Sequence, residues 1–485
     1  MSSSGGFLEG LRRRFFDVRR GEWSVVAAAA LYFFFLLACN YVLRPLREEM
    51  GIRGGADDLP WLYTGTLVTT LAIAPPFAWL VSRLERRRFI AITYRGVAIS
   101  LVGFYFWLKA SGVKQSPASY TYFVWFSASN LLVVSLFWGF LADVLTNEQA
   151  KRIYGLVGAG GTLGAIAGSW LTSTVMELER HPDPVTLLLV AAVLMELCVQ
   201  CMHWIARRAP ARATSPSSTD TPVSPSAPAP AARAASEAHA KPDLLAGLRL
   251  VAAKPYLRIL CVYMVLQTIC ATFFYNQRGY IVDAEITERA ERVKFFADID
   301  LWVNGISLTF QLLFTGNLLK TIGVRPMLLA LPVFGLAGFS WLASASSLVA
   351  IQFSMIATRA CEFATAKPAR ETLYTVVSRE EKYQAKGFID TFVYRGGDMV
   401  GAWLFLGLRT LFVPAEADAG AAPSAGHAQS GTALVGVAVG LCFTAAAFVL
   451  GRRQEALAKA VAGREVPSAP APTSSTSLES GERRA

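Results

Sequence analysis

Runs of about 20 apolar residues recur along the whole chain, and they constrain the fold more than any other feature. A helix rises about 1.5 Å per residue, so about 20 apolar residues cross the hydrocarbon core of a bilayer. Only 17% of the 485 residues are charged, whereas a soluble domain averages about 25%. The sequence therefore predicts an all-α polytopic membrane protein with twelve transmembrane helices, at about residues 23–43, 60–81, 89–108, 119–145, 153–176, 185–206, 255–280, 297–319, 325–345, 347–376, 386–412 and 432–451.

Basic residues gather in alternate loops between these spans. They precede span one and follow spans two, six and twelve, whereas loops such as "ELERHPDP" lack the excess. Short cytoplasmic loops retain Lys and Arg, so we expect both termini in the cytoplasm and the chain in the inner (plasma) membrane. The formal net charge of +11 is then a sign of topology. The expected macromolecular environment is the lipid bilayer, not nucleic acid.

Signatures of enzymes and of metal sites are missing from the sequence. It contains no HExxH motif, no nucleophile elbow and no cluster of metal ligands. Cys198 and Cys201 form a CxxC near His203, which raises the alternative of a metal or redox pair. A membrane-embedded helix offers neither exposure nor thiolate character, which favours simple packing. We therefore expect no enzyme activity, no metal and no cofactor.

A segment rich in Pro, Ala and Ser divides the spans into six and six. Residues 209–245 cannot bury a core and are predicted to form a disordered cytoplasmic linker. The predicted units on either side are a six-helix half at 1–208 and a second at 246–455. A disordered tail is expected at 456–485.

The two halves resemble each other at a nearly constant offset. An offset of 233 maps Gly164 and Gly168 onto Gly397 and Gly401, and an offset of 234 maps Arg44 onto Arg278. Each half has an even number of spans, so both copies insert in the same orientation. Parallel six-span repeats around a central site are typical of the major facilitator architecture.

The stretch "LVGAGGTLGAIAG" contains Gly160, Gly164 and Gly168 on one helical face. No strand precedes them and no Lys-Ser/Thr follows, so a phosphate-binding loop is excluded. Small residues let helix backbones approach closely in lipid. We therefore predict that span five packs against span eleven through these glycines and their counterparts Gly397 and Gly401.

The loop "GNLLKTIGVR" between spans eight and nine has the spacing of the facilitator motif G-x-L-x-D-x-x-G-x-R, with Lys320 in place of the acid. Its expected role is helix capping and charge pairing between helices, not substrate binding.

Charged residues occur deep inside several predicted spans, where a charge costs at least about 2.5 kcal/mol. One interpretation is internal pairing, because Arg359–Glu362, Lys367–Glu371, Lys386–Asp390 and Arg395–Asp398 have helical spacing. The other is a polyanionic substrate, since Arg offers forked donors to phosphate or carboxylate. The candidate substrate-binding residues are Arg44, Arg47, Asn276, Arg278, Arg359, Glu362, Arg370, Asp390, Arg395 and Asp398, and Glu196 is a candidate for proton coupling.

Three segments carry a resemblance to a known family: "YVLRPLREEMG", "FWGFLADVLTNEQAKRIYGLVGAGGTLGAIAG" and "PARETLYTVVSREEKYQAKGFIDTFVYRGGDMVGAW". In these the chain resembles the bacterial branch of the ATP/ADP translocase-type nucleotide exchangers, which are related to the major facilitator superfamily. The resemblance runs across most of both halves and implies a transporter fold.

The leading hypothesis is a secondary active transporter that moves a small organic anion, with nucleotide (ATP/ADP-like) exchange as its form, by alternating access. Two alternatives stay open: a proton-coupled exporter of another small molecule, and a membrane interaction protein that does not transport.

Overall fold

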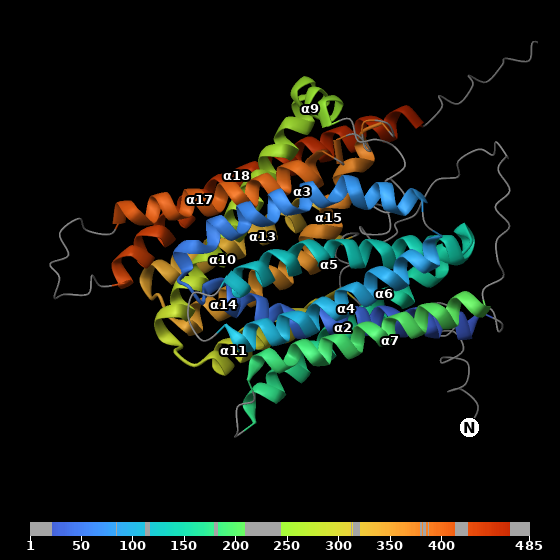
Figure 1. The fold of residues 1–485 in the computed structure, drawn as a ribbon. Helices are drawn as coiled ribbons and strands as arrows, with labels where there is room; N and C mark the ends of the chain where they lie inside the picture. Colours follow the sequence, from blue (N-terminus) through green and yellow to red (C-terminus); the bar gives the residue numbers. More distant parts are fainter. Residues whose placement is uncertain are drawn as a thin grey trace, which may run out of the picture.

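The computed structural model describes residues 22–83, 85–111, 117–178, 183–208, 244–311, 313, 321–378, 381, 385–386, 388–412 and 425–465. Within these ranges the chain is helical and contains no strand. The helices run side by side along one common direction (Figure 1). Most of the predicted linker, 209–243, and the loop at 413–424 lie outside the described residues.

The first half contains six long helices, each of which overlaps a predicted span. Short 3₁₀ turns at Ala56–Asp58 (η1) and Pro184–Thr186 (η2) lead into two of them. The six are α2 (Trp23–Ile52), α3 (Leu59–Arg83), α4 (Arg86–Ala110), α5 (Pro117–Val144), α6 (Asn147–Glu177) and α7 (Leu187–Arg208).

The second half repeats this order after one short helix, α9 (Leu244–Ala253). Two of its predicted spans contain a π-helical turn, η4 (Glu362–Ala366) and η6 (Ile389–Val393). The helices are α10 (Pro255–Glu285), α11 (Arg289–Phe310), α13 (Val324–Ser344), α14 (Leu348–Cys361), α15 (Lys367–Leu373), α17 (Tyr394–Phe412) and α18 (Ala425–Glu465).

Seven of the described helices are long and apolar enough to cross a membrane: α2, α4, α5, α7, α10, α13 and α18. The other predicted spans are occupied by α3, α6, α11, the α14–η4–α15 run and η6–α17, which carry more Gly, Thr, Pro or charged residues. Four of these less apolar helices meet in pairs across the halves, α3 with α17 and α6 with α11. These two helix pairs therefore form part of the interface between the halves.

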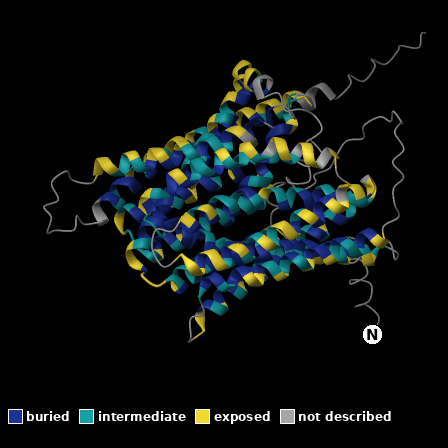
Figure 2. Cartoon of the chain, viewed as in Figure 1, coloured by how far each residue is buried: buried dark blue, intermediate teal, exposed yellow. Residues whose placement is uncertain are grey.

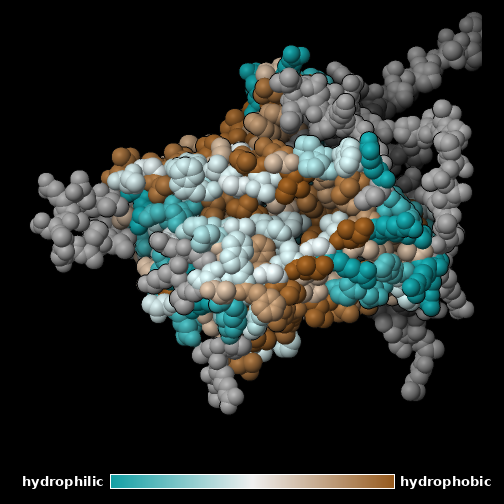
Figure 3. All heavy atoms as spheres, in the orientation of Figure 1, coloured by the Kyte–Doolittle hydropathy of each residue, from teal (hydrophilic) through white to brown (hydrophobic). Residues whose placement is uncertain are grey.

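Burial follows the pattern of a bundle embedded in lipid. Buried residues lie inside the bundle and exposed ones along its outer faces (Figure 2). Many exposed side chains are large and apolar, including Ile99 at 72% and Leu411 at 77% exposed. On the face in Figure 3, apolar residues cover much of the middle and hydrophilic ones gather mostly toward the two ends. Such a surface matches a hydrocarbon environment.

The predicted packing of span five against span eleven is wrong, because each glycine helix packs against the first helix of its own half. A Cβ at Gly164 would lie 2.1 Å from the carbonyl oxygen of Phe34, and one at Gly397 would lie 2.1 Å from Oγ1 of Thr268. Thus α6 lies against α2, and α17 lies against α10.

These two contacts correspond to each other in sequence. Gly168 meets Ala38 and Gly401 meets Thr272, so both contact partners are also related by an offset of 234. The repeat is therefore visible in matched helix–helix contacts and not only in isolated residue identities.

The C-terminal tail begins later than predicted. Helix α18 continues to Glu465, so residues 456–465 are helical, and 466–485 lie outside the described residues.

Candidate functional site

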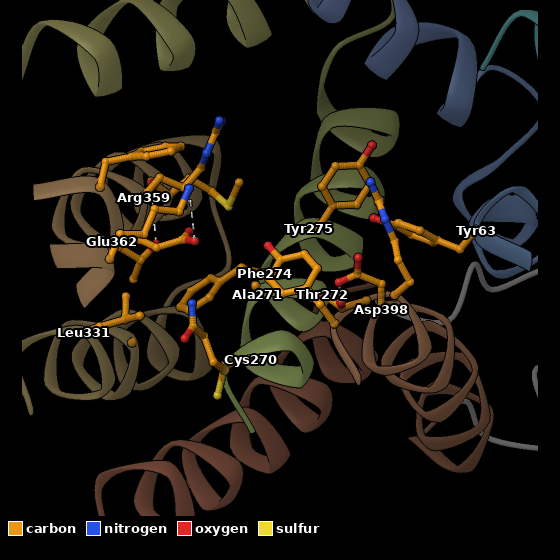
Figure 4. A pocket seen from close by; sticks show the side chains of 18 of the residues that line it. Tyr63, Cys270, Ala271, Thr272, Phe274, Tyr275, Leu331, Arg359, Glu362 and Asp398 are labelled. Atoms are coloured by element: carbon orange, nitrogen blue, oxygen red, sulfur yellow. Dashed lines mark hydrogen bonds and ion pairs between the residues drawn. The ribbon is translucent and has the colours of Figure 1, made fainter. Parts of the chain in front are cut away.

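A cavity of about 460 Å³ lies between the two halves. It is lined by residues of α2, α3 and α5 from the first half and of α10, α13, α14, α17 and α18 from the second. Figure 4 shows Thr272 and Tyr275 of α10 near the centre, with Arg359 and Glu362 on one side and Tyr63 and Asp398 on the other. We call this space the central cavity.

The central cavity is basic and aromatic. Two acidic side chains, Glu362 and Asp398, face a larger number of cations in its wall. The five basic residues are Arg44, Arg47, Arg359, Lys367 and Arg395, and the six aromatic ones are Tyr63, Phe274, Tyr275, Phe363, Tyr394 and Phe443. The excess of positive charge favours an anionic occupant, and the rings offer flat apolar surfaces.

Asp300 on α11 connects two of these arginines. Its side chain is only 2% exposed. Arg359 Nη1 donates a hydrogen bond to Asp300 Oδ1 at 2.8 Å, and Arg44 Nη1 lies 3.2 Å from the same oxygen. Asp300 therefore links α2 of the first half to α14 of the second through one buried carboxylate.

Glu48 on α2 forms a second buried link between the halves, near the end of that helix. Arg278 Nη2 donates to Glu48 Oε2 at 2.6 Å, and the Tyr275 hydroxyl donates to the same oxygen. Arg47 Nη1 bonds the other oxygen at 2.9 Å. A buried carboxylate is stable when it is paired and hydrogen-bonded in this way.

Further contacts join the halves at this same end of the bundle, which we call the Glu48 end. Arg289 donates to Glu49 at 3.0 Å, and Arg409 donates to Asp57 at 3.1 Å. Trp403 Nε1 donates to the hydroxyl of Thr64 at 3.1 Å. The two halves are thus held together beyond the central cavity on the Glu48 side.

The π-helical turn η4 brings Glu362 and Lys367 together in the wall of the central cavity. The backbone N–H of Lys367 donates to the carbonyl of Glu362, which closes an i→i+5 turn. Lys367 Nζ then lies 3.8 Å from Glu362 Oε1. The predicted Arg359–Glu362 and Lys367–Glu371 pairs are therefore replaced by Arg359–Asp300 and Lys367–Glu362, and Lys386 instead bonds Glu371 at 2.8 Å.

The structure places six of the ten predicted substrate residues in the wall of the central cavity: Arg44, Arg47, Arg359, Glu362, Arg395 and Asp398. Three others lie away from it. Asn276 Nδ2 donates to the carbonyl of Thr272 in its own helix, Arg278 bonds Glu48, and Arg370 lies 3.8 Å from Met264 Sδ. The side chain of Asp390 lies outside the described residues.

Glu196 lies at a different place from the central cavity. Its two carboxylate oxygens accept hydrogen bonds from Arg95 at 3.1 and 3.2 Å, between α7 and α4. The side chains of Arg95 and Glu196 are 49% and 41% exposed. The pair lies on the outer surface of the first half.

Sequence reasoning missed Glu48 and Asp300 as members of the site, and it noted Lys367 among the charges of span ten without listing it as a substrate residue. Asp300 falls in predicted span eight and Lys367 in span ten, so each had the signal of a charge inside an apolar segment. Glu48 follows Arg44 and Arg47 in "LREE", where the end of a span and a loop look alike.

The chain is similar to known nucleotide carriers. A family model described as "TLC ATP/ADP transporter" matches residues 107–334. The "ADP,ATP carrier protein 1" of Chlamydia pneumoniae is 20% identical over 309 residues, which is 58% of each chain. The chain therefore spans little more than half the length of that relative.

Solved structures match the fold more completely. The nucleoside transporter NupG is 16% identical with a TM-score of 0.57 over 90% of this chain and 99% of its own. A bacterial homologue of the human lysosomal transporter Spinster is 13% identical with a TM-score of 0.61 over 91% and 99%. These likenesses show that the all-helical bundle shares its fold with these two solved proteins. The family model and the Chlamydia relative confirm the resemblance of the chain to the ATP/ADP transporter family.

Proposed function

We propose that the chain is a secondary active transporter that moves an organic anion, and that a nucleotide is exchanged in the manner of an ATP/ADP carrier. The observation that carries the proposal is the central cavity, with five basic side chains between two similar halves. Its volume of about 460 Å³ falls in the range of small-molecule sites, about 300–1,000 Å³.

Nucleotide chemistry fits both parts of the cavity wall. Arginine forks bind phosphate oxygens in pairs, and aromatic rings stack on bases. Arginines and rings lie together in this wall: Arg47 Nη1 donates to the Tyr275 hydroxyl at 3.3 Å, and Arg395 follows Tyr394 on α17. A compound with a charged end and a flat end would use both.

Transport would proceed by alternating access. The contacts of Glu48, Glu49 and Asp57 close the Glu48 end in this conformation. An anion bound by Arg44 and Arg359 competes with Asp300 for the same guanidinium groups. Binding would therefore weaken one of the links between the halves and favour their rotation.

The proposal includes the membrane arrangement. We propose twelve spans in two six-helix halves, 1–208 and 246–455, joined by a cytoplasmic linker, with both termini cytoplasmic in the inner membrane. A cysteine at Ser226 should then react only with a reagent supplied from the cytoplasmic side, and one at Ser424 only from outside. Both positions lie outside the described residues. Reversed labelling would reject this orientation.

The direct test is uptake into proteoliposomes that are preloaded with unlabelled ATP, ADP, phosphate or other anions. Labelled nucleotide should enter only when a nucleotide is inside. Uptake that follows a proton gradient in empty vesicles would instead support a proton-coupled facilitator. No uptake of any anion under either condition would support the interaction-protein alternative. The position of Glu196, exposed and paired with Arg95, gives the proton-coupled alternative no added support.

A further inference from the structure

A second hollow of about 500 Å³ lies on the surface between α10 and α18. It is at the opposite end of the bundle from Glu48, because it is formed by the first two turns of α10 and by the part of α18 that lies beside them. Four residues of each helix line it: Pro255, Arg258, Ile259 and Val262, and Ala445, Ala446, Val449 and Arg453. We call it the α10–α18 groove.

The chemistry of the groove changes along its length. Arg258 and Arg453 lie at the mouth, and the walls beyond them are aliphatic. Ala445 and Ala446 are small and leave room between the two helices. Val262 is 52% and Val449 is 43% exposed, so the apolar wall opens to the surroundings and not to the protein core.

The side chains of the two arginines have no hydrogen bond or ion pair with any other described residue. The nearest acid along α18, Glu455, lies 3.7 Å from Arg325, and Lys254 at the start of α10 bonds Glu381. The N-terminus of α10 has no side-chain cap, so its first N–H groups add a positive end to the mouth of the groove.

We propose that the α10–α18 groove binds an anionic phospholipid of the membrane leaflet on this side, with the phosphate at Arg258 and Arg453 and one acyl chain along the valine wall. Under the proposed topology this is the cytoplasmic leaflet. A free phosphate would use the arginines but not the aliphatic wall. A zwitterionic lipid such as phosphatidylcholine would fill the wall, but its ammonium group would bring a third positive charge close to the two arginines.

The dimensions agree with a lipid. Pro255 and Val262 are seven residues apart, which is about 10 Å along a helix. The hydrocarbon thickness of one leaflet is about 15 Å. The groove can therefore hold a headgroup at its mouth and the upper part of one acyl chain. Basic pockets between spans on the cytoplasmic side are known to favour acidic headgroups.

The test is native mass spectrometry of the purified full chain titrated with phosphatidylglycerol or with phosphatidylcholine. We expect one tightly bound phosphatidylglycerol that is lost in the Arg258→Ala/Arg453→Ala double variant, with affinity about 30-fold lower at about 1 kcal/mol per arginine. The Arg258→Lys/Arg453→Lys double variant should retain most of the affinity for phosphatidylglycerol. The Arg207→Ala/Arg208→Ala variant is the matched control, because it removes two charges from the same end of the bundle without touching the groove.

A second variant separates the acyl chain from the headgroup. Ala446→Phe fills the groove and leaves both arginines in place, so it should also lose the bound lipid. An equal loss of phosphatidylglycerol in the Arg207→Ala/Arg208→Ala control would mean that binding reflects general charge attraction, and it would overturn the proposal. Undiminished binding in Ala446→Phe, or equal affinity for inorganic phosphate measured by calorimetry, would also overturn it. None of these readouts needs transport, so the result is independent of the proposed function.

Discussion

At the scale of single residues, Asp300 is the position where a substitution tests the proposed function most directly. Its buried carboxylate faces Arg44 and Arg359 from opposite halves. Removal of one member of a buried ion pair leaves uncompensated charge and costs about 3–5 kcal/mol. A bound anion supplies the missing negative charge, so the stability lost on substitution of Asp300 should be smaller when the ligand is bound.

We therefore expect Asp300→Asn to lower the melting temperature of the protein without ligand, and to increase the rise in melting temperature that ATP produces. Thermal unfolding with and without ATP measures both. Asp298→Asn is the control on the same helix, because Asp298 bonds Ser173 and Lys294 and not a cavity arginine. An ATP-induced rise no larger than in the parent protein would contradict competition for the arginines.

Arg395 is the cavity cation whose substitution tests ligand contact most directly. It lines the cavity and has no ion pair within 4 Å among the described residues. A hydrogen bond to a charged group contributes about 1.5–3 kcal/mol. Arg395→Ala should therefore weaken binding of labelled ATP by about 10- to 150-fold, with unchanged melting temperature.

The matched substitution is Arg95→Ala, which removes an arginine from the outer surface of the first half. It should leave ATP affinity within about twofold. Recovery of affinity in Arg395→Ala/Asp398→Ala would assign Arg395 to a structural pair with Asp398 instead of the substrate.

Which residues pair could not be predicted from spacing alone. The three-residue spacing of Arg359 and Glu362 predicts a pair in a regular helix, but Arg359 turns to Asp300 on another helix and Glu362 pairs across a π-turn. Sequence spacing reports neighbours within one regular helix. It contains neither the helix across the interface nor the extra residue of an i→i+5 turn.

At the scale of helices, the glycine contacts set how closely α6 approaches α2. The Cβ of Ala at 164 would meet the backbone oxygen of Phe34, which cannot move without the helix. Gly164→Ala should therefore destabilise the protein by about 1–3 kcal/mol. Gly158→Ala, with nothing within 4 Å, should be neutral or stabilising, because Ala favours helix by up to about 1 kcal/mol.

The destabilising effect of the corresponding substitution in the second half should be reversed by a second substitution in α10. At Gly397 the three atoms nearest to the new Cβ all belong to the Thr268 side chain, with Oγ1 at 2.1 Å and Cβ at 3.0 Å. Gly397→Ala should lower stability, and Thr268→Ala should restore most of it. Melting temperatures in one detergent provide the comparison. A neutral Gly164→Ala, or no restoration by Thr268→Ala, would show that these contacts do not limit helix approach.

The glycine pattern predicts a packing helix but not its partner. The four-residue spacing of Gly160, Gly164 and Gly168 correctly indicated a smooth helical face. The partner is chosen by the three-dimensional arrangement, in which both repeats place the same helix, α2 or α10, against the glycine face. The offset of 234 already relates Arg44 to Arg278 in the sequence, but it does not say that their helices are the partners of the two glycine faces.

At the scale of the whole molecule, the closed Glu48 end makes a prediction about motion. Trp403 of α17 touches both Trp61 and Thr64 of α3 across the halves. Cys is shorter than Trp, so a Thr64→Cys/Trp403→Cys protein should be cross-linked by a short bifunctional methanethiosulfonate reagent that spans the space of the indole ring. Because alternating access requires these helices to separate, the cross-link should abolish nucleotide exchange, and dithiothreitol should restore it.

The single variants Thr64→Cys and Trp403→Cys, treated with the same reagent, are the controls for the native cysteines. Full exchange by the cross-linked protein would mean that the halves do not separate at this end during transport.

The general fold could be predicted from hydropathy, because a helix that crosses the bilayer must be apolar over the thickness of the hydrocarbon core. Helices occur at all twelve predicted ranges, although only seven meet the criteria for length and composition. The exceptions include α6 and α11, which pack against each other across the halves. The glycine face of α6 packs against α2, so both sides of this helix are covered by protein. Local composition therefore identifies outer helices better than those covered by protein.

Helix α18 has a length that the bilayer does not require. Its 41 residues extend about 60 Å, roughly twice the thickness of the hydrocarbon core. Its last ten residues, 456–465, lie beyond the contact of Glu455 with Arg325. The same helix contributes Phe443 to the wall of the central cavity. A tilt of about 10° about its middle moves Glu465 by about 5 Å. The end of α18 therefore moves whenever its membrane part tilts. A spin label at Ala460, outside the bilayer, would report that movement.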